Sequence, residues 1–342
     1  MRCRRSSHES LLLMFSQHAI AAPEWPGKLG PTLRQPSSSM AKKTGGIFGT
    51  EFKMGPSYSH GANILKKAAD QLSKGGGKHE ALIRTVAQRY VDWRRAATVP
   101  PSKDELANDW RGFVKRQTQL FEPYRASLDT KEVDQAFDSR GALQPSALEE
   151  FCTYLFQPLV QSLGGDVELG KREVFHGLYF SSPDFASFSV LPEPRYQGAS
   201  VDFVICKRLG SMFSSRKHKH EAEIFVPVIA VECKTYLDRP RWFASEILAD
   251  NLKRGFPYVR QYVIAETLKL DTTKVNIAGS RVDHVYVLRR TENVDRKKRR
   301  ADEKDLPPIH GEAVFGFFDS VRRHLTTPWE PLQGWKETGI LK

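Results

Sequence analysis

The segment Glu223–Asp238, EIFVPVIAVECKTYLD, contains an almost unbroken aliphatic run from Ile224 to Val231, which stops abruptly at Glu232, Cys233 and Lys234. Such a run is typical of a strand that is buried on both faces. Because side chains alternate along a strand, we expect Glu232 and Lys234 to project together and Cys233 to point the opposite way. The segment therefore predicts a buried central strand with a charged end.

An acid thirty positions upstream makes this triplet more specific than its E-x-K spacing alone. The chain has four other D/E-x-K triplets, but only Glu232/Lys234 ends an apolar run and follows a second strand-like segment, VDFVICKRL. Asp202 lies near the start of that segment and completes the spacing D-x29-E-x-K on two neighbouring strands. The pattern predicts either two metal-binding carboxylates or an ordinary ion pair at the end of a sheet.

These residues resemble the PD-(D/E)xK nucleases, with Asp202 as the first acid and Glu232-Cys233-Lys234 as the second half of the motif. Ser200-Val201 precede Asp202, so the proline of the family name is absent. More narrowly, VECKTYLD followed by DNLKRGFPYVRQYVIAETLKL is similar to the Bpu10I type of restriction endonucleases. The resemblance covers roughly Ser146 to Arg290.

The resemblance implies a Mg2+ site, because hydrolysis of a phosphodiester bond needs a hard cation with oxygen ligands. Asp202, Glu232 and the backbone carbonyl of Cys233 would hold the metal. Lys234 would orient or deprotonate the attacking water and offset the negative charge of the transition state.

A further carboxylate for this site is expected near the start of a helix. Ser146 and Glu149 have the spacing of a capping box, which predicts that a helix begins there. In the resembled fold, Glu149 or Glu150 can join the metal ligands, but helix capping explains a glutamate in the first turn equally well.

By the same resemblance, the chain is a type II restriction endonuclease that cleaves double-stranded DNA at a short specific sequence. It would act as a homodimer, or as one half of a heterodimer with a related subunit. A nuclease of repair or of a mobile element, and a non-catalytic DNA-binding subunit, remain alternatives because one scaffold serves several functions.

Charge supports a nucleic-acid partner, because the 342 residues carry a formal net charge of +12. Arg216, Lys217 and Lys219 lie between the two expected catalytic strands, where they would contact phosphates or simply form a solvated hairpin end. No apolar stretch of 18 residues argues for a membrane. The four cysteines lack metal-ligand spacing and predict reduced thiols in a cytoplasmic protein of bacterial type.

The expected fold class is α/β (α+β), with a restriction-endonuclease-like mixed sheet flanked by helices and preceded by a helical region. We expect residues 1–45 to be a disordered extension or a mis-called start with translation beginning at Met40, residues 46–130 to be helical, and residues 131–342 to form the nuclease domain. Periodicity and turn residues predict helices from Ser59, over 79–95, from a Ser102/Glu105 capping box through Phe121, from Ser146 towards Pro158, and over 242–254 and 312–324. They predict strands over 172–180, 186–192, 201–209, 258–267 and 284–290.

Overall fold

The computed structural model describes residues 55–72, 79–137, 143–216, 218–292, 298–299, 302 and 306–329. All of them fall within one unit, Gln35–Lys342. The expectations for residues 1–45, including a start at Met40, lie outside the described residues. Within the described ranges, no helix is long and apolar enough to cross a membrane.

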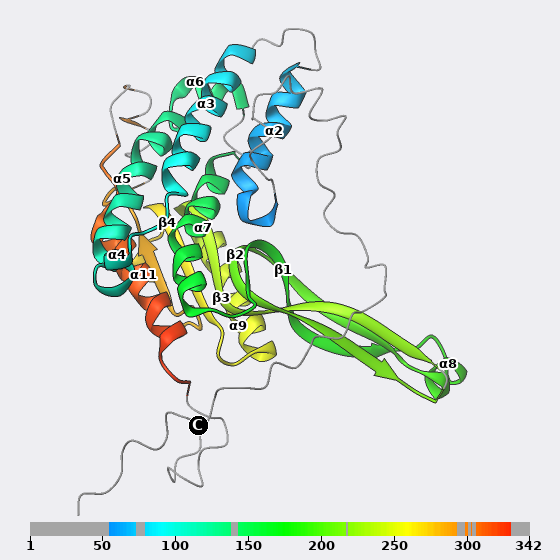
Figure 1. Ribbon diagram of the computed structural model, residues 1–342. Helices are drawn as coiled ribbons and strands as arrows, with labels where there is room; N and C mark the ends of the chain where they lie inside the picture. The colour runs from blue at the N-terminus through cyan, green and yellow to red at the C-terminus, as the bar shows by residue number, and fades with distance from the viewer. Residues whose placement is uncertain are drawn as a thin grey trace, which may run out of the picture. The chain divides into compact units, whose positions relative to one another are not determined.

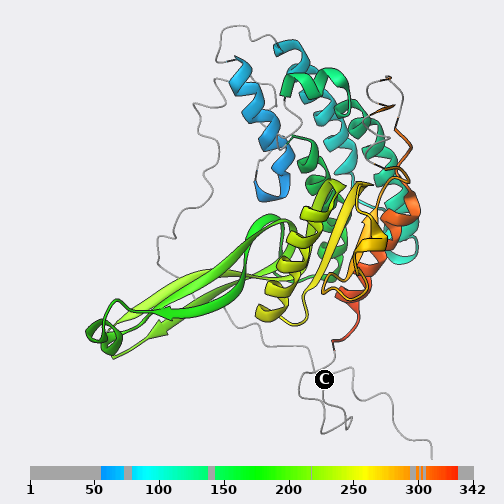
Figure 2. The same ribbon diagram turned by 180° about the vertical axis from the view of Figure 1, so that it is seen from behind.

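A five-stranded mixed sheet forms the centre of the described fold, with the strand order β1-β2-β3-β4-β5 (Figures 1 and 2). The first three strands pair antiparallel, whereas β4 runs parallel to β3 and β5 runs parallel to β4. The bounds are β1 Glu168–Ser181, β2 Glu193–Ser214, β3 Lys219–Leu237, β4 Arg260–Leu268 and β5 His284–Val287. The predicted mixed sheet is confirmed, and the segments that carry Asp202 and Glu232 are neighbouring strands.

Helices cover both faces of this sheet. Ile229, Val231 and Cys233 of β3 share one core with α5, α7 and α11, while Ala230 shares another with Leu252 of α9. Within the apolar run of β3, Ile229 to Val231 are thus buried on both faces, as predicted, whereas Ile224 to Val226 are only partly buried. The helices are η1 Pro56–Tyr58, α2 Ser59–Leu72, α3 Glu80–Ala97, α4 Lys103–Asn108, α5 Trp110–Leu128, α6 Lys131–Phe137, α7 Leu143–Leu163, α8 Phe185–Val190, α9 Arg239–Gly255, η2 Thr272–Lys274 and α11 Gly311–Thr326.

Two helix predictions need correction at their boundaries. The Ser102/Glu105 capping box is present, but the helix it opens ends at Asn108, because Asp109 leaves the helical conformation and caps a new helix through the N–H of Gly112. The predicted capping box of Ser146 and Glu149 is wrong, because α7 begins at Leu143 and Ser146 lies inside this helix. Pro158 also lies within α7, which continues to Leu163.

The predicted strand over 186–192 is also wrong, because residues Phe185–Val190 form the short helix α8. The side chain of Asp184 accepts a hydrogen bond of 2.7 Å from the backbone N–H of Ser187 and so caps this helix. Local capping chemistry therefore overrides the apolar alternation that indicated a strand.

Strand β2 folds back on itself instead of running straight. The hydroxyls of Tyr196 and Ser211 lie 2.6 Å apart, although fifteen residues of straight strand would separate them by roughly 50 Å. The rings of Phe180 and Phe213 also pack together, with centroids 5.3 Å apart. The β1–β2 hairpin and the β2–β3 hairpin, residues 173–200 and 207–226, therefore lie side by side and form one projecting arm (Figure 1).

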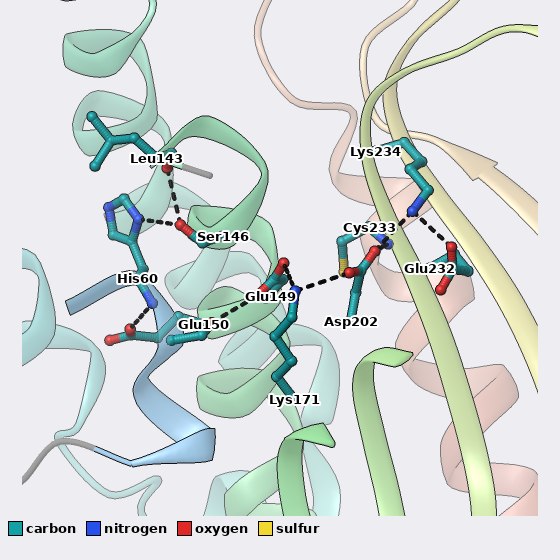
Figure 3. A network of polar contacts seen from close by, with 11 residues as sticks. His60, Leu143, Ser146, Glu149, Glu150, Lys171, Asp202, Glu232, Cys233 and Lys234 are labelled. Atoms are coloured by element: carbon teal, nitrogen blue, oxygen red, sulfur yellow. Dashed lines mark hydrogen bonds and ion pairs between the residues drawn. The ribbon is translucent and has the colours of Figure 1, made fainter. Parts of the chain in front are cut away.

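A buried polar network joins α2 to α7. The fully buried carboxylate of Glu150 accepts hydrogen bonds from the backbone N–H groups of His60 and Gly61, each 3.1 Å long, and from Tyr90 at 2.8 Å. The ring of His60 contacts the hydroxyl of Ser146 at 2.9 Å. This network fixes the first turn of α2 beside the middle of α7 (Figure 3).

The buried ring of His60 predicts a specific pH dependence of stability. Burial, reinforced by the charge of Arg125, lowers the pKa of His60 from 6.5 to about 3. Between these two values the unfolded chain binds a proton that the folded chain excludes, so the free energy of unfolding falls as the pH falls from about 6.5. The contribution of one such group approaches about 1.4 kcal/mol per pH unit.

We therefore expect His60→Gln to give a shallower pH dependence than the wild type in urea unfolding measured between about pH 4 and 7. His218→Gln, at an exposed hairpin turn, is the matched control and should leave the slope unchanged. Equal slopes for wild type and His60→Gln would contradict a buried neutral imidazole.

Candidate active site

Strands β2 and β3 separate at the point where the predicted acids lie. Their pairing ends at Phe203 and Val231, after which β2 stays paired with β1 and β3 stays paired with β4. Asp202 and Glu232 are the first residues beyond this fork. The fork therefore places both carboxylates at the edge of the core and not within a continuous sheet.

Beyond the fork, the side chain of Asp202 provides a hydrogen-bond acceptor for β3 in place of the backbone of β2. Its Oδ2 accepts a hydrogen bond of 3.0 Å from the backbone N–H of Cys233 and one of 2.9 Å from Nζ of Lys234. The same Nζ lies 2.7 Å from Oε2 of Glu232. Glu232 and Lys234 share a face as the alternation predicts, while the side chain of Cys233 is buried in the core on the other face (Figure 3).

A β-bulge determines where Asp202 points. Two residues of β2, Asp202 and Phe203, lie opposite a single residue of β1, Lys171. Val201 and Phe203 consequently enter different cores, although residues two apart on a regular strand share a face. Bulges re-aim side chains in this way, and here the bulge brings Asp202 and Lys171 together.

Lys171 connects the fork to α7, and the sequence prediction missed it. Its Nζ lies 2.9 Å from Oε1 of Glu149 and 3.2 Å from Oδ1 of Asp202. The other oxygen of Glu149 accepts a hydrogen bond of 2.7 Å from the hydroxyl of Ser59. No spacing in the sequence signals Lys171, because its contacts depend on the bulge and on the position of α7.

Five side chains therefore alternate in charge in the order Glu149, Lys171, Asp202, Lys234, Glu232, which we call the charged row (Figure 3). The row contains three carboxylates and two ammonium groups. An ordinary ion pair has one carboxylate and one ammonium group, whereas in this row the carboxylates outnumber the ammonium groups.

Burial and neighbouring charges divide the acids of the row. Burial raises the pKa values of Glu149 and Glu232, and the negative charge of Asp202 raises both further. Burial also opposes ionisation of Asp202, but Lys234 and Lys171 outweigh it and hold its pKa below the usual value. The central carboxylate is thus held as an anion, whereas the two outer carboxylates bind a proton more readily than ordinary glutamates.

Glu149 and Glu150 occupy different environments, although the sequence left open which of them would approach the site. Glu149 is part of the charged row, whereas Glu150 points into the buried network around His60. The hydroxyl of Tyr154 also donates to Glu150 at 2.5 Å. The structure therefore brings Glu149, but not Glu150, together with Asp202.

The charged row offers the type of ligand atom that binds a hard divalent cation. Asp202, Glu232 and Glu149 offer only carboxylate oxygens, the ligands that Mg2+ prefers. Among the described residues, no three His, Cys, Asp or Glu side chains converge on a single point, because lysines lie between the acids. The ammonium groups of Lys171 and Lys234 thus lie between the carboxylates and balance part of their negative charge.

The basic loop lies away from the charged row. Arg216 and Lys219 flank the turn of the second hairpin, and Lys217 lies outside the described residues. Phe213, next to this turn, packs against Phe180 of the first hairpin, with ring centroids 5.3 Å apart, whereas Asp202 lies at the fork of β2 and β3 where the arm leaves the core. The structure does not bring these cations together with the predicted catalytic residues.

Comparison with known proteins now adds to this geometry. Residues 142–304 match the sequence profile described as Bpu10I restriction endonuclease. The predicted resemblance to Bpu10I-type restriction endonucleases is confirmed. The matched region contains all five members of the charged row, and it extends beyond the predicted span of Ser146 to Arg290 at both ends.

A solved structure, titled native BbvCI A2B2 tetramer at low resolution, has a similar fold. The alignment has a TM-score of 0.60 and 17% identity, and it covers 82% of this chain and 100% of the other. Curated proteins give no significant match. The likeness in fold thus extends beyond the Bpu10I-type region to most of the chain.

The position of Lys171 in the charged row leads to a prediction about stability. Lys171→Met should cost about 1–3 kcal/mol at neutral pH, because the buried carboxylate of Glu149 loses its charged donor. Without Lys171 the pKa of Glu149 rises further, so the loss should shrink as the pH falls and Glu149 becomes protonated. Urea unfolding of both proteins from about pH 8 to pH 4 measures this difference, with Lys171→Arg as the charge-retaining control. A loss that does not depend on pH would contradict the role of charge.

Proposed function

We propose that this chain is a subunit of a type II restriction endonuclease that hydrolyses phosphodiester bonds of double-stranded DNA at a short specific sequence, with Mg2+ as cofactor. The observation that carries the proposal is the charged row, because it gathers three carboxylates and two lysines at a strand fork inside the Bpu10I-type region. An isolated ion pair would not need this excess of acid.

In this proposal Asp202 and Glu232 hold the metal. The N–H of Cys233 points to Asp202, and the N–H and C=O of one strand residue face the same neighbour. We therefore expect the carbonyl of Cys233 to face the fork as well and to supply a further oxygen ligand. When bound, the metal would stabilise charge on the phosphate and lower the pKa of a water molecule.

Lys234 would act as a charged donor beside the scissile phosphate. Burial opposes its protonation, but Asp202 and Glu232 outweigh burial and raise its pKa above the ordinary value for lysine. A protonated lysine in this position can orient a water molecule and offset negative charge on the phosphate.

Binding of DNA would involve surfaces outside the charged row. The net charge of +12 favours a polyanionic partner, and Arg216, Lys217 and Lys219 are candidates for phosphate contacts at the end of the second hairpin. The structural neighbour is titled as a tetramer of the A2B2 type. By analogy, this chain would act together with a second subunit, either a copy of itself or a related chain.

Replacement of a predicted metal ligand tests this function directly. The wild-type protein, alone and with any related subunit encoded beside it, should convert supercoiled plasmid into nicked or linear DNA when Mg2+ is present and not when EDTA is present. Glu232→Ala should abolish cleavage because it removes one of the two carboxylates that hold the metal.

Glu221→Ala is the matched control, because it removes an exposed glutamate from the same strand. It should cleave like the wild type. Cleavage by Glu232→Ala at the wild-type rate would reject the metal assignment, and the charged row would then be an ion-paired end of a sheet.

Lys234→Met should separate chemistry from affinity. We expect it to bind DNA with unchanged affinity in a mobility-shift titration, yet to cleave at least about a hundredfold more slowly, which is the low end of acid-base contributions. Lys274→Met removes a surface lysine that pairs with Asp271 and is the matched control. Weaker binding with an unchanged rate per bound complex would make Lys234 a phosphate anchor instead.

A further inference from the structure

The end of the first hairpin of the arm carries an exposed apolar surface. Six of the thirteen large hydrophobic side chains that are exposed on the described surface lie between residues 178 and 190. We call these six residues the apolar tip: Leu178, Tyr179, Phe180, Phe185, Phe188 and Val190. Both ribbon views show α8, which carries three of them, at the far end of the projecting arm (Figures 1 and 2).

The helix at this tip lacks the packing that normally stabilises a helix. None of the six residues of α8 is buried, and Phe185 and Phe188 are 81% and 56% exposed, with their rings stacked on each other. So short a helix is not stable in water by its own propensity, and helices in proteins depend on burial of an apolar face. The side chains of the tip are thus of the kind found in a hydrophobic core, yet each of them is at least 40% exposed.

The charge of the tip argues against DNA as its partner. Within residues 178–196 the charged residues are Asp184 and the ion pair of Glu193 with Arg195, whereas the other hairpin of the arm ends in Arg216 and Lys219. Surfaces that bind DNA are strongly positive, while the centres of protein interfaces are poor in charge and rich in aromatic residues. Of the two hairpin ends, the apolar tip therefore fits a protein.

The area of the tip is large enough for a dimer contact. An aromatic side chain offers about 150–250 Å² for burial, so the four aromatic residues at their observed exposures, between 50% and 81%, offer roughly 360–600 Å². Two such tips that cover each other fully would remove about 700–1,200 Å² from water, and the upper end of this range reaches the size of stable interfaces. An apolar surface with almost no charge is also complementary to itself, as a twofold contact requires.

We propose that the apolar tip packs against the same tip of a second copy of this chain, so that two arms hold two nuclease subunits together. This inference deepens the proposed function, on which it rests for the presence of a second subunit, by naming the contact surface. It places the contact at the end of the arm, away from the charged row, so that neither active site is covered by it.

Sedimentation of the full-length chain without DNA tests this contact independently of cleavage. The wild-type protein should sediment at twice the chain mass at micromolar concentration. Phe185→Ser/Phe188→Ser should dissociate at least about thirtyfold more readily, which is the effect of losing a single hot-spot residue. Its circular dichroism should match the wild type, because α8 buries no residue.

The matched control removes exposed apolar side chains from the body of the protein. Phe243→Ser/Ile247→Ser changes two exposed residues of α9 and should leave self-association unchanged. Monomeric wild type, or equal self-association of wild type and tip variant, would overturn the proposal. Loss of association by the α9 variant would also overturn it, because α9 would then be the contact.

Cross-linking tests the tip-to-tip arrangement itself. In a Cys3→Ser background, Ala186→Cys places a thiol on the exposed surface of α8, and Ala244→Cys places one on the exposed surface of α9. Mild oxidation should join two chains through residue 186 and not through residue 244. Absence of the first cross-link in a dimeric protein, or a tip variant that stays dimeric but loses DNA affinity, would reject the contact. Cleavage assays on the same variants would show separately whether the nuclease proposal fails.

Discussion

The separation of β2 from β3 is the constraint on which the candidate site depends. A strand that leaves a sheet exposes backbone groups which must find other partners. At this fork the side chain of Asp202 accepts a hydrogen bond from the backbone N–H of Cys233, so its carboxylate is held against the end of the core. The charge placed there then requires cations, and Lys171 and Lys234 provide them. The carboxylate of Asp202 therefore satisfies a backbone N–H at the fork and also creates the negative charge that the two lysines balance.

Helix α7 links this site to the helical region through two consecutive glutamates. Glu149 faces Lys171 and Ser59, and Glu150 accepts hydrogen bonds from the next two backbone N–H groups of α2. Because the buried contacts of Glu150 fix the rotation of α7, they also fix the direction in which Glu149 points. The start of α2 is thus a structural support of the charged row. One hydrophobic core runs from α2 and α3 through α7 to the sheet.

The arm shows how one long strand can serve two purposes. The central part of β2 lies in the sheet beside β1 and β3 and carries Asp202, while its two ends enter two hairpins that pack side by side. Contacts such as those of Tyr196 with Ser211 and of Phe180 with Phe213 hold the two hairpins side by side. One hairpin ends in the apolar tip and the other ends in basic residues, so a single projection presents two chemically different surfaces.

The sequence alone determined the parts of the site that depend on one strand. The aliphatic run that ends at Glu232, and the alternation that places Lys234 beside it, follow from the period of two, and the structure shows both. Most helices and strands were also predictable, since their periodicity and caps are local. The bulge that turns Asp202 towards Lys171, and the rotation of α7 that brings in Glu149, depend on packing between distant segments and have no local sequence signal. Helix α8 was misread because Asp184 caps it, while its apolar alternation indicated a strand. Local patterns fix which face a side chain occupies, but contacts between distant segments depend on register and packing, which no single stretch of sequence contains.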